Sequence, residues 1–204
     1  AQLDFDGKVI HNEKIALGAG GEDPKLFKYR NIVNLSWVES TFPNQPWRSV
    51  VRYGVLEEKG PRMINPELPG NDFSTIQKNW VFFGIGTSLY CIYQCHPEQV
   101  TYCLQGAGMV SKYTVTPGPR WPYGQIRGGS APVPFEGNLL RFFHSGLDNE
   151  FGQFYRRYFM GAYLMRPEPP FEVLAVSERP IVFGSEVDGL KKAEKDGSIG
   201  QDES

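Results

Sequence analysis

The spacing of apolar residues along the chain predicts an almost entirely β protein. Short runs in which apolar and polar positions alternate predict strands, and Pro/Gly-rich stretches at residues 57–75 and 117–134 predict long loops between them. The predicted strands cover residues 3–10, 13–18, 32–38, 48–56, 80–84, 88–94, 98–104, 138–144, 158–165 and 171–176. Residues 185–204 are predicted to be a disordered tail, because they carry mixed charge and almost no large apolar residues.

Three of these strands follow a short polar motif at the same distance. The motifs contain Asp23, Asn79 and Gly129, each ten residues ahead of a residue in an alternating strand, and successive motifs are 56 and 50 residues apart. A repeat of about this length that contains several strands is typical of a β-propeller blade. Equivalent positions in successive blades face one central axis, so the three motifs are predicted to converge on one polar pocket.

The predicted β-propeller domain spans residues 1–184 and contains three to four blades. Propellers generally close with at least four blades, because an open edge leaves backbone groups unpaired. Three explanations stay open. The chain is part of a larger propeller, its first and last segments share one blade, or it forms an open propeller that pairs with something else. A homo-oligomer also stays open.

Composition describes a folded protein and excludes two classes of partner. The chain has 204 residues, of which 40% are hydrophobic and 14% aromatic, and its 23 glycines and 16 prolines suit many short strands joined by turns. A formal net charge of −2 gives no electrostatic basis for binding nucleic acid or an anionic membrane. No apolar run approaches the roughly 20 residues needed to span a bilayer.

The first residues and the cysteines favour a cytoplasmic protein. The chain starts at Ala1 with neither a signal peptide nor a transit peptide. The absence of an initiating Met indicates a processed chain or part of a longer one. Cys91, Cys95 and Cys103 are odd in number, which excludes a full disulfide framework, and reduced thiols suit the cytosol. With His96, two of them supply at most three ligands, whereas structural zinc takes four, so buried thiols are predicted rather than a metal site.

The first motif, Glu22-Asp23-Pro24-Lys25, offers an acid. Proline restricts the residue before it, so the backbone of Asp23 is predicted to be extended and its carboxyl group aimed. A carboxyl group that faces a propeller axis among aromatic rings can act as a general acid, which is the role predicted for Asp23. The alternative is an exposed Asp-Pro turn with solvated charges.

The second and third motifs carry groups that bind sugars and anions. Lys78, Asn79 and Trp80 offer hydrogen bonds to hydroxyl groups and a flat apolar face for a sugar ring, unless Trp80 belongs to the core. Arg127 offers a bidentate fork to phosphate or carboxylate, and the glycines after it let the backbone approach closely; the alternative is a flexible turn. His144 follows the third strand and is a further candidate, with a structural histidine as the alternative.

These motifs resemble those of the five-bladed propellers of glycoside hydrolase family 130, the β-mannoside phosphorylases and their hydrolytic relatives. Gly21-Glu22-Asp23-Pro24-Lys25 is similar to the family's Gly-x-Glu-Asp-Pro-Arg signature, and Lys78-Asn79-Trp80 to a segment of some relatives. Arg127-Gly128-Gly129 and Phe142-Phe143-His144 are similar to later Gly-Gly and Tyr-His-Gly segments. The likeness runs from about residue 18 to residue 184, so the chain resembles the family without its N-terminal blade or blades.

The resemblance implies an enzyme that cleaves β-mannosides with inversion. In the family, the signature aspartate is the general acid and inorganic phosphate is the nucleophile, whereas inverting hydrolysis needs a second carboxylate to activate water. Carried over, Asp23 is the acid, Arg127 and His144 lie near the anion or the rim, and no cofactor is implied beyond phosphate as a co-substrate. The predicted substrate-binding residues are Glu22, Lys25, Lys78, Asn79, Trp80, Arg127 and His144.

Two features of the motifs limit this assignment. Lys25 replaces the signature arginine, which removes a bidentate fork for the anion. Opposite charge lowers the pKa of a carboxyl group, so Asp23 must lie nearer to aromatic rings such as Trp80 than to the cations, or pass its proton through a substrate hydroxyl group. Phosphorolysis and hydrolysis therefore both stay open. The alternatives are a carbohydrate-binding propeller without catalysis and a purely structural or protein-binding propeller.

Overall fold

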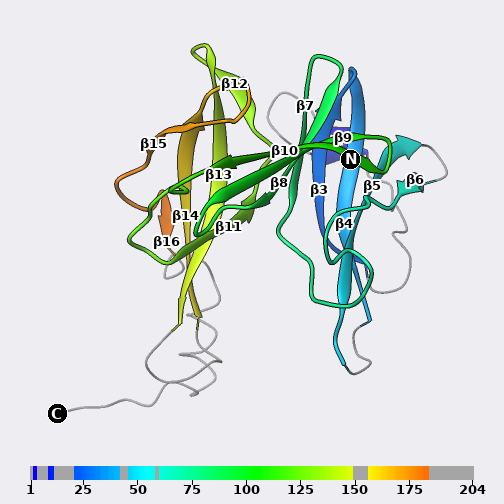
Figure 1. Cartoon of the computed structure of the whole chain (residues 1–204), viewed down its shortest axis with the longest axis horizontal. Coiled ribbons are helices and arrows are strands. Elements are labelled where there is room, and N and C mark those ends of the chain that lie inside the picture. The colour runs from blue at the N-terminus through cyan, green and yellow to red at the C-terminus, as the bar shows by residue number, and fades with distance from the viewer. Residues whose placement is uncertain are drawn as a thin grey trace.

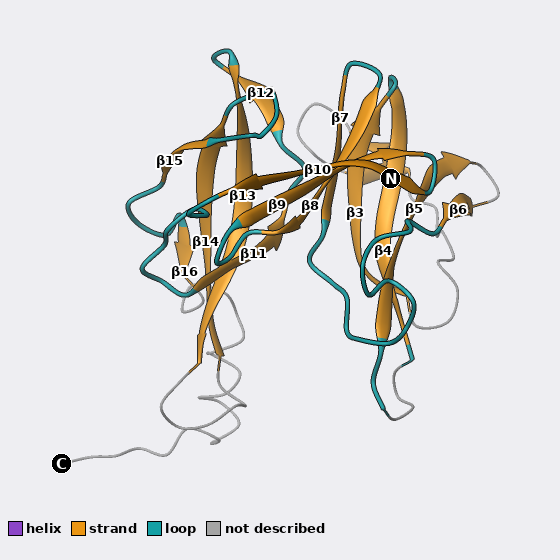
Figure 2. Cartoon of the chain, in the orientation of Figure 1, coloured by secondary structure: helices purple, strands orange, loops and turns teal. Residues whose placement is uncertain are grey.

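The chain is all-β, as the spacing of apolar residues predicts. The computed structural model describes residues 2–3, 9–11, 21–41, 46–57, 60–148 and 156–183, and these residues form strands and loops but no helix (Figures 1 and 2). None of them therefore forms a helix long and apolar enough to cross a membrane. The strand predicted at 13–18 and the disordered tail predicted after residue 184 lie outside the described residues.

The strands form three antiparallel sheets that follow one another along the chain. The first sheet contains β3 (Gly21–Tyr29), β4 (Ile32–Ser40), β5 (Ser49–Glu57) and β6 (Gly60–Ile64). The second contains β7 (Val81–Ile85), β8 (Ser88–Gln94), β9 (Gln99–Gln105) and β10 (Gly108–Val115). The third contains β11 (Gln125–Gly129), β12 (Val133–Phe135), β13 (Asn138–Asp148), β14 (Arg156–Met165), β15 (Val173–Val176) and β16 (Val182–Phe183). A separate pair joins β1 (Gln2–Leu3) to β2 (Val9–His11). Figure 1 shows the second sheet between the other two.

The sequence pattern fails at strands on the edges of these sheets. β6 and β11 lie inside the two stretches predicted as loops, β12 begins at the end of the second stretch, and neither β3 nor β10 is predicted as a strand. β3, β6, β10 and β11 are each the outermost strand of a sheet, and β12 pairs only with β13. An edge strand makes ladder hydrogen bonds on one side only and therefore tolerates Pro and Gly. In a sequence, these residues predict a loop rather than a strand.

The second sheet supplies two apolar faces and thereby joins the other two sheets. Side chains alternate along β8, so Leu89 and Cys91 pack toward the first sheet while Tyr90 and Ile92 pack toward the third. A strand that is buried on both faces reads as a nearly continuous apolar run, which is why β8 is easy to predict.

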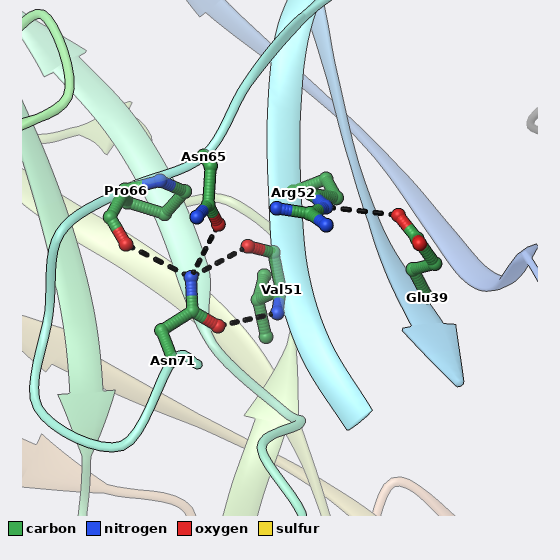
Figure 3. A network of polar contacts seen from close by, with 6 residues as sticks. All are labelled: Glu39, Val51, Arg52, Asn65, Pro66 and Asn71. Atoms are coloured by element: carbon green, nitrogen blue, oxygen red, sulfur yellow. Dashed lines mark hydrogen bonds and ion pairs between the residues drawn. The ribbon is translucent and has the colours of Figure 1, made fainter. Parts of the chain in front are cut away.

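A loop residue replaces a strand partner at the edge of β5. The Asn71 side chain accepts a hydrogen bond from the Val51 backbone N–H (2.7 Å) and donates to the carbonyl oxygens of Val51 (3.0 Å) and Pro66 (2.9 Å). Figure 3 shows this network beside the Arg52–Glu39 ion pair (2.9 Å). Asn71 thus satisfies backbone groups that β6 is too short to reach, and it fixes the loop that leads to the second sheet.

Candidate functional site

The three motifs of the sequence repeat line one pocket of about 390 Å³. Its walls come from the first sheet, the third sheet and the segment directly before β7. The lining residues are Asp23, Pro24 and Lys25 of β3, Lys78 and Asn79 before β7, Arg127 of β11, His144 of β13 and Tyr158 of β14. Residues more than 100 positions apart in the sequence therefore share one cavity.

A β-bulge places Asp23 in this pocket. Glu22 pairs with Val38 and Lys25 pairs with Ser36, so two residues of β3 oppose the single residue between their partners on β4. The backbone φ angle of Asp23 is 52°, in the left-handed region. The extended backbone expected at Asp23 is therefore wrong. The bulge sets this angle, aspartate tolerates it better than most residues, and a bulge is one place where a strand accepts the following proline.

A second bulge arranges the opposite wall. Ile126 pairs with Ser145 and Gly129 pairs with Phe143, so the two residues between them, one of which is Arg127, oppose the single residue His144. The bulge thus sets Arg127 beside His144, which lies on the neighbouring strand of the same sheet.

Gly128 in this bulge joins the third sheet to the segment before β7. A methyl group at Gly128 would meet the carbonyl oxygen of Asn79 and would lie 2.8 Å from its Cα atom. The close approach that this glycine permits is therefore to protein backbone. Asn79 has a positive φ of 68°, like the φ of Asp23, so the two equivalent motif positions share an unusual backbone conformation.

The lining of the pocket carries more positive than negative charge. Lys25, Lys78 and Arg127 contribute three cations against the single carboxylate of Asp23. Burial lowers the pKa of Lys25, although Asp23 opposes this. Burial, and then the charges of Lys25 and Arg127, likewise hold the pKa of His144 below its ordinary value. His144 is therefore neutral at pH 7, and the lining as a whole favours an anion.

The aromatic side chain at the pocket is Tyr158, which the sequence pattern does not single out from the other aromatic residues at 151–163. Its ring is 52% exposed and lies 6.3 Å from the His144 ring, centre to centre. The available signal is register, because Tyr158 begins the strand predicted at 158–165 and pairs with Gly146, two residues after His144 and on the same face of the sheet. On the other side of the pocket, the Lys78 ammonium lies 4.9 Å from the centre of the Trp47 ring.

Two residues of the predicted substrate-binding set do not line the pocket. Trp80 is only 2% exposed and packs 4.9 Å from Tyr93 in the cluster between the first and second sheets, so its indole face is not open to a sugar. The alternative assignment of Trp80, to the core, describes its position. Glu22 is exposed on β3, where it pairs with Val38, and it is not among the lining residues.

A buried arginine lies behind the pocket and is not predicted from the sequence. Arg141 is fully buried on β13 and donates hydrogen bonds to the Tyr163 hydroxyl group, to Cys95 Sγ (3.3 Å) and to the carbonyl oxygen of Arg127 (3.5 Å). The signal for it is a charged residue between Leu139 and Phe143, at an inward-facing position of an alternating strand. Cys95 is a free, buried thiol.

Comparisons with known proteins give a likeness in structure but none in sequence. No family model and no curated protein matches the chain. A protein described as "a putative glycoside hydrolase" from Parabacteroides distasonis matches with a TM-score of 0.52 and 12% identity, over 80% of this chain and 54% of that one. A glycosyl hydrolase from Bacteroides ovatus matches with a TM-score of 0.45 and 10% identity, over 78% of this chain and 52% of that one. The chain thus spans about half the length of these structures, and the first likeness shows a shared fold.

Proposed function

We propose that the chain is a carbohydrate-active protein that cleaves β-mannosides with inversion, with Asp23 as the general acid. The observation that carries this proposal is the gathering of Asp23, Asn79 and Arg127 in one pocket. Glycoside cleavage needs an acid next to groups that bind hydroxyls, and a volume of about 390 Å³ is within the range of small-molecule sites. The fold shared with a described glycoside hydrolase supports a carbohydrate substrate.

The same arrangement supports a partial β-propeller of the five-bladed type for the domain predicted at residues 1–184. In a propeller, the first strand of each blade lines the central axis. A methyl group at Gly84 of β7 would lie 2.9 Å from the carbonyl oxygen of Lys28 in β3, and Gly128 of β11 lies against Asn79. The first strands of the first and second sheets are therefore neighbours, and the first strand of the third sheet lies against the segment that leads into β7. Lys28 and Gly84 are 56 residues apart, which is the period of the motifs.

The charges in the pocket favour phosphate over water as the nucleophile. Inverting hydrolysis needs a second carboxylate to activate water, and Asp23 is the single carboxylate among the lining residues. Phosphate arrives already ionised, and Lys25, Lys78 and Arg127 offer it cationic partners. Lys25 therefore contributes a charge where the family signature has arginine.

In the proposed reaction, a phosphate oxygen attacks the anomeric carbon and the glycosidic C–O bond breaks. Its electron pair stays on the leaving oxygen, which takes a proton from Asp23, and hydrogen phosphate supplies the proton that restores the acid. Trp80 lies in the core and Lys25 lies close to Asp23. Transfer through a substrate hydroxyl group therefore fits this pocket better than an acid enclosed by aromatic rings.

A carbohydrate-binding protein without catalysis is the second candidate, because Asp23 is exposed. Product analysis separates the two. The protein is incubated with β-linked mannobiose and an aryl β-mannoside, with and without inorganic phosphate. Mannose 1-phosphate formed only with phosphate supports phosphorolysis, and free mannose in both conditions supports hydrolysis. Binding without turnover of either substrate contradicts the enzymatic proposal.

Replacement of the acid is the most specific test of the assigned role. Asp23→Asn keeps the shape of the side chain and removes its proton, so kcat is expected to fall by about 10²- to 10⁴-fold while the sugar still binds. Glu22→Gln is the matched control, because Glu22 is the adjacent carboxylate and lies outside the pocket; its kcat is expected to equal that of the wild type. Full turnover by Asp23→Asn would remove the catalytic assignment.

A further inference from the structure

Arg141 carries a buried charge without an acidic partner. Its side chain is fully buried between the second and third sheets, and its Nε atom has no hydrogen-bond partner among the described residues. The ion pairs of the described chain join other residues, and none involves Arg141. Burying an unpaired charge is unfavourable, so a position of this kind calls for an explanation beyond packing.

The groups that contact Arg141 hold its guanidinium in one orientation, and none of them is a carboxylate. Its Nη1 atom donates to the Tyr163 hydroxyl group, and burial raises the pKa of that phenol, which keeps it uncharged. Tyr163 in turn donates to Gln99 Oε1 (3.0 Å), and the Gln99 amide donates to the carbonyl oxygen of Phe171 (2.9 Å). These contacts fix the guanidinium, and no carboxylate among the described residues forms an ion pair with it.

The charge lies directly behind the wall of the pocket. The Arg141 Nη2 atom donates to the carbonyl oxygen of Arg127, within the bulge that sets Arg127 beside His144. Two lining residues on different sheets also experience the Arg141 charge, which acts to lower the pKa of both Lys25 and His144. Arg141 itself is too deeply buried to reach a bound ligand.

We propose that Arg141 is a positioning residue for an oxyanion, whose negative charge in the pocket is the missing counter-charge of the buried guanidinium. Arg141 acts in two ways: it holds the backbone of the Arg127 bulge, and it adds a fixed positive potential behind the three lining cations. The ligand chemistry is an oxyanion, either free phosphate or a carboxylate carried by a sugar. The inference rests on the proposed function only in taking this pocket as the binding site, and it does not require turnover.

The test is titration calorimetry of the full chain with inorganic phosphate and, separately, with a uronic acid. Arg141→Met and Arg141→Gln remove the charge, and the Gln variant keeps a hydrogen-bond donor. Arg141→Lys keeps the charge, and Tyr163→Phe removes an Arg141 partner without changing the charge. The neutral variants are expected to bind about tenfold more weakly, the effect of one charge roughly 10 Å away at an effective dielectric constant of about 20. Arg141→Lys and Tyr163→Phe, which keep the charge, are expected to bind the anion with an affinity within about threefold of the wild type.

Unfolding in urea separates this role from a structural one. Replacing a buried, unpaired charge with an apolar side chain is often neutral or stabilising, so Arg141→Met is expected to unfold at the wild-type urea concentration or above it while binding the anion more weakly. The proposal is overturned by neutral variants that bind like the wild type. It is equally overturned if Tyr163→Phe, which keeps the charge, binds the anion as weakly as the neutral variants do.

The titrations with phosphate and with the uronic acid also distinguish a failure of this inference from a failure of the proposed reaction. A wild-type protein that binds neither phosphate nor the uronic acid overturns the inference and leaves hydrolysis of mannosides intact. Arg141-dependent binding of phosphate without turnover of any mannoside supports the inference and contradicts the proposed function. Binding of the uronic acid alone supports the inference and identifies the anion as part of the sugar.

Discussion

The two interfaces that join the three sheets differ in their chemistry. Between the first and second sheets, the rings of Phe27, Tyr53 and Phe82 pack together, with Phe82 5.7 Å from Phe27 and 5.1 Å from Tyr53. Between the second and third sheets, a comparable aromatic cluster surrounds a chain of polar groups that includes Arg141 and Tyr163. The first interface is made of apolar and aromatic side chains, and the Tyr53 hydroxyl group donates a hydrogen bond across it to the carbonyl oxygen of Gly106. The second also holds a guanidinium group whose charge burial disfavours.

Truncation at the centre of the first interface is expected to have the largest effect on stability. Phe82 is 1% exposed, and Phe82→Ala leaves a cavity between Phe27 and Tyr53, so the free energy of unfolding should fall by about 3–5 kcal/mol. Urea denaturation measures this change. Phe142→Ala is the control, because this ring on β13 is 37% exposed and the loss should be much smaller. A loss below about 1 kcal/mol for Phe82→Ala would contradict the packing described here.

Two glycine substitutions distinguish the pocket from the rest of the fold. A methyl group at Gly128 would meet the carbonyl oxygen of Asn79, and one at Gly54 would meet that of Arg62 within the first sheet. Both Gly128→Ala and Gly54→Ala are expected to destabilise the protein by about 1–3 kcal/mol through overpacking. Only Gly128→Ala should also weaken phosphate binding by the folded protein, since it separates Arg127 from Asn79. Equal affinities in calorimetry for the two variants would show that this contact does not shape the pocket.

The titration of His144, on the pocket side of the second interface, is expected to change the free energy of unfolding by less than the substitutions above. The pKa of His144 is lowered in the folded chain, so between that value and the ordinary 6.5 the unfolded chain binds more protons than the folded one. Stability should therefore decrease as the pH falls below about 6.5 and level off once the folded pKa is passed. Urea denaturation of the wild type and of His144→Gln across this range measures the difference. The same slope in both proteins would contradict the lowered pKa.

The repeat in the sequence predicts the pocket better than it predicts the strands. Asp23, Asn79 and Arg127 are predicted to converge because a fixed repeat period places equivalent positions together. This convergence does not depend on the backbone conformation of each motif. The backbone of Asp23 is mispredicted because the bulge depends on pairing with β4, which a rule about the residue before proline does not include. Tyr158 and Arg141 are missed because their positions depend on cross-strand register between β13 and β14.

We propose above that a mannoside binds next to Asp23, in the pocket formed by the first sheet, the third sheet and the segment before β7. A crystal structure of Asp23→Asn soaked with a β-mannoside and inorganic phosphate tests it most directly, since the variant should bind the sugar without cleaving it. We expect a sugar whose glycosidic oxygen lies within hydrogen-bond distance of the side chain at position 23 or of a sugar hydroxyl group that contacts this side chain. We also expect phosphate between Lys25 and Arg127. A mannoside bound elsewhere on the molecule, with this pocket holding neither sugar nor phosphate, would contradict the proposal.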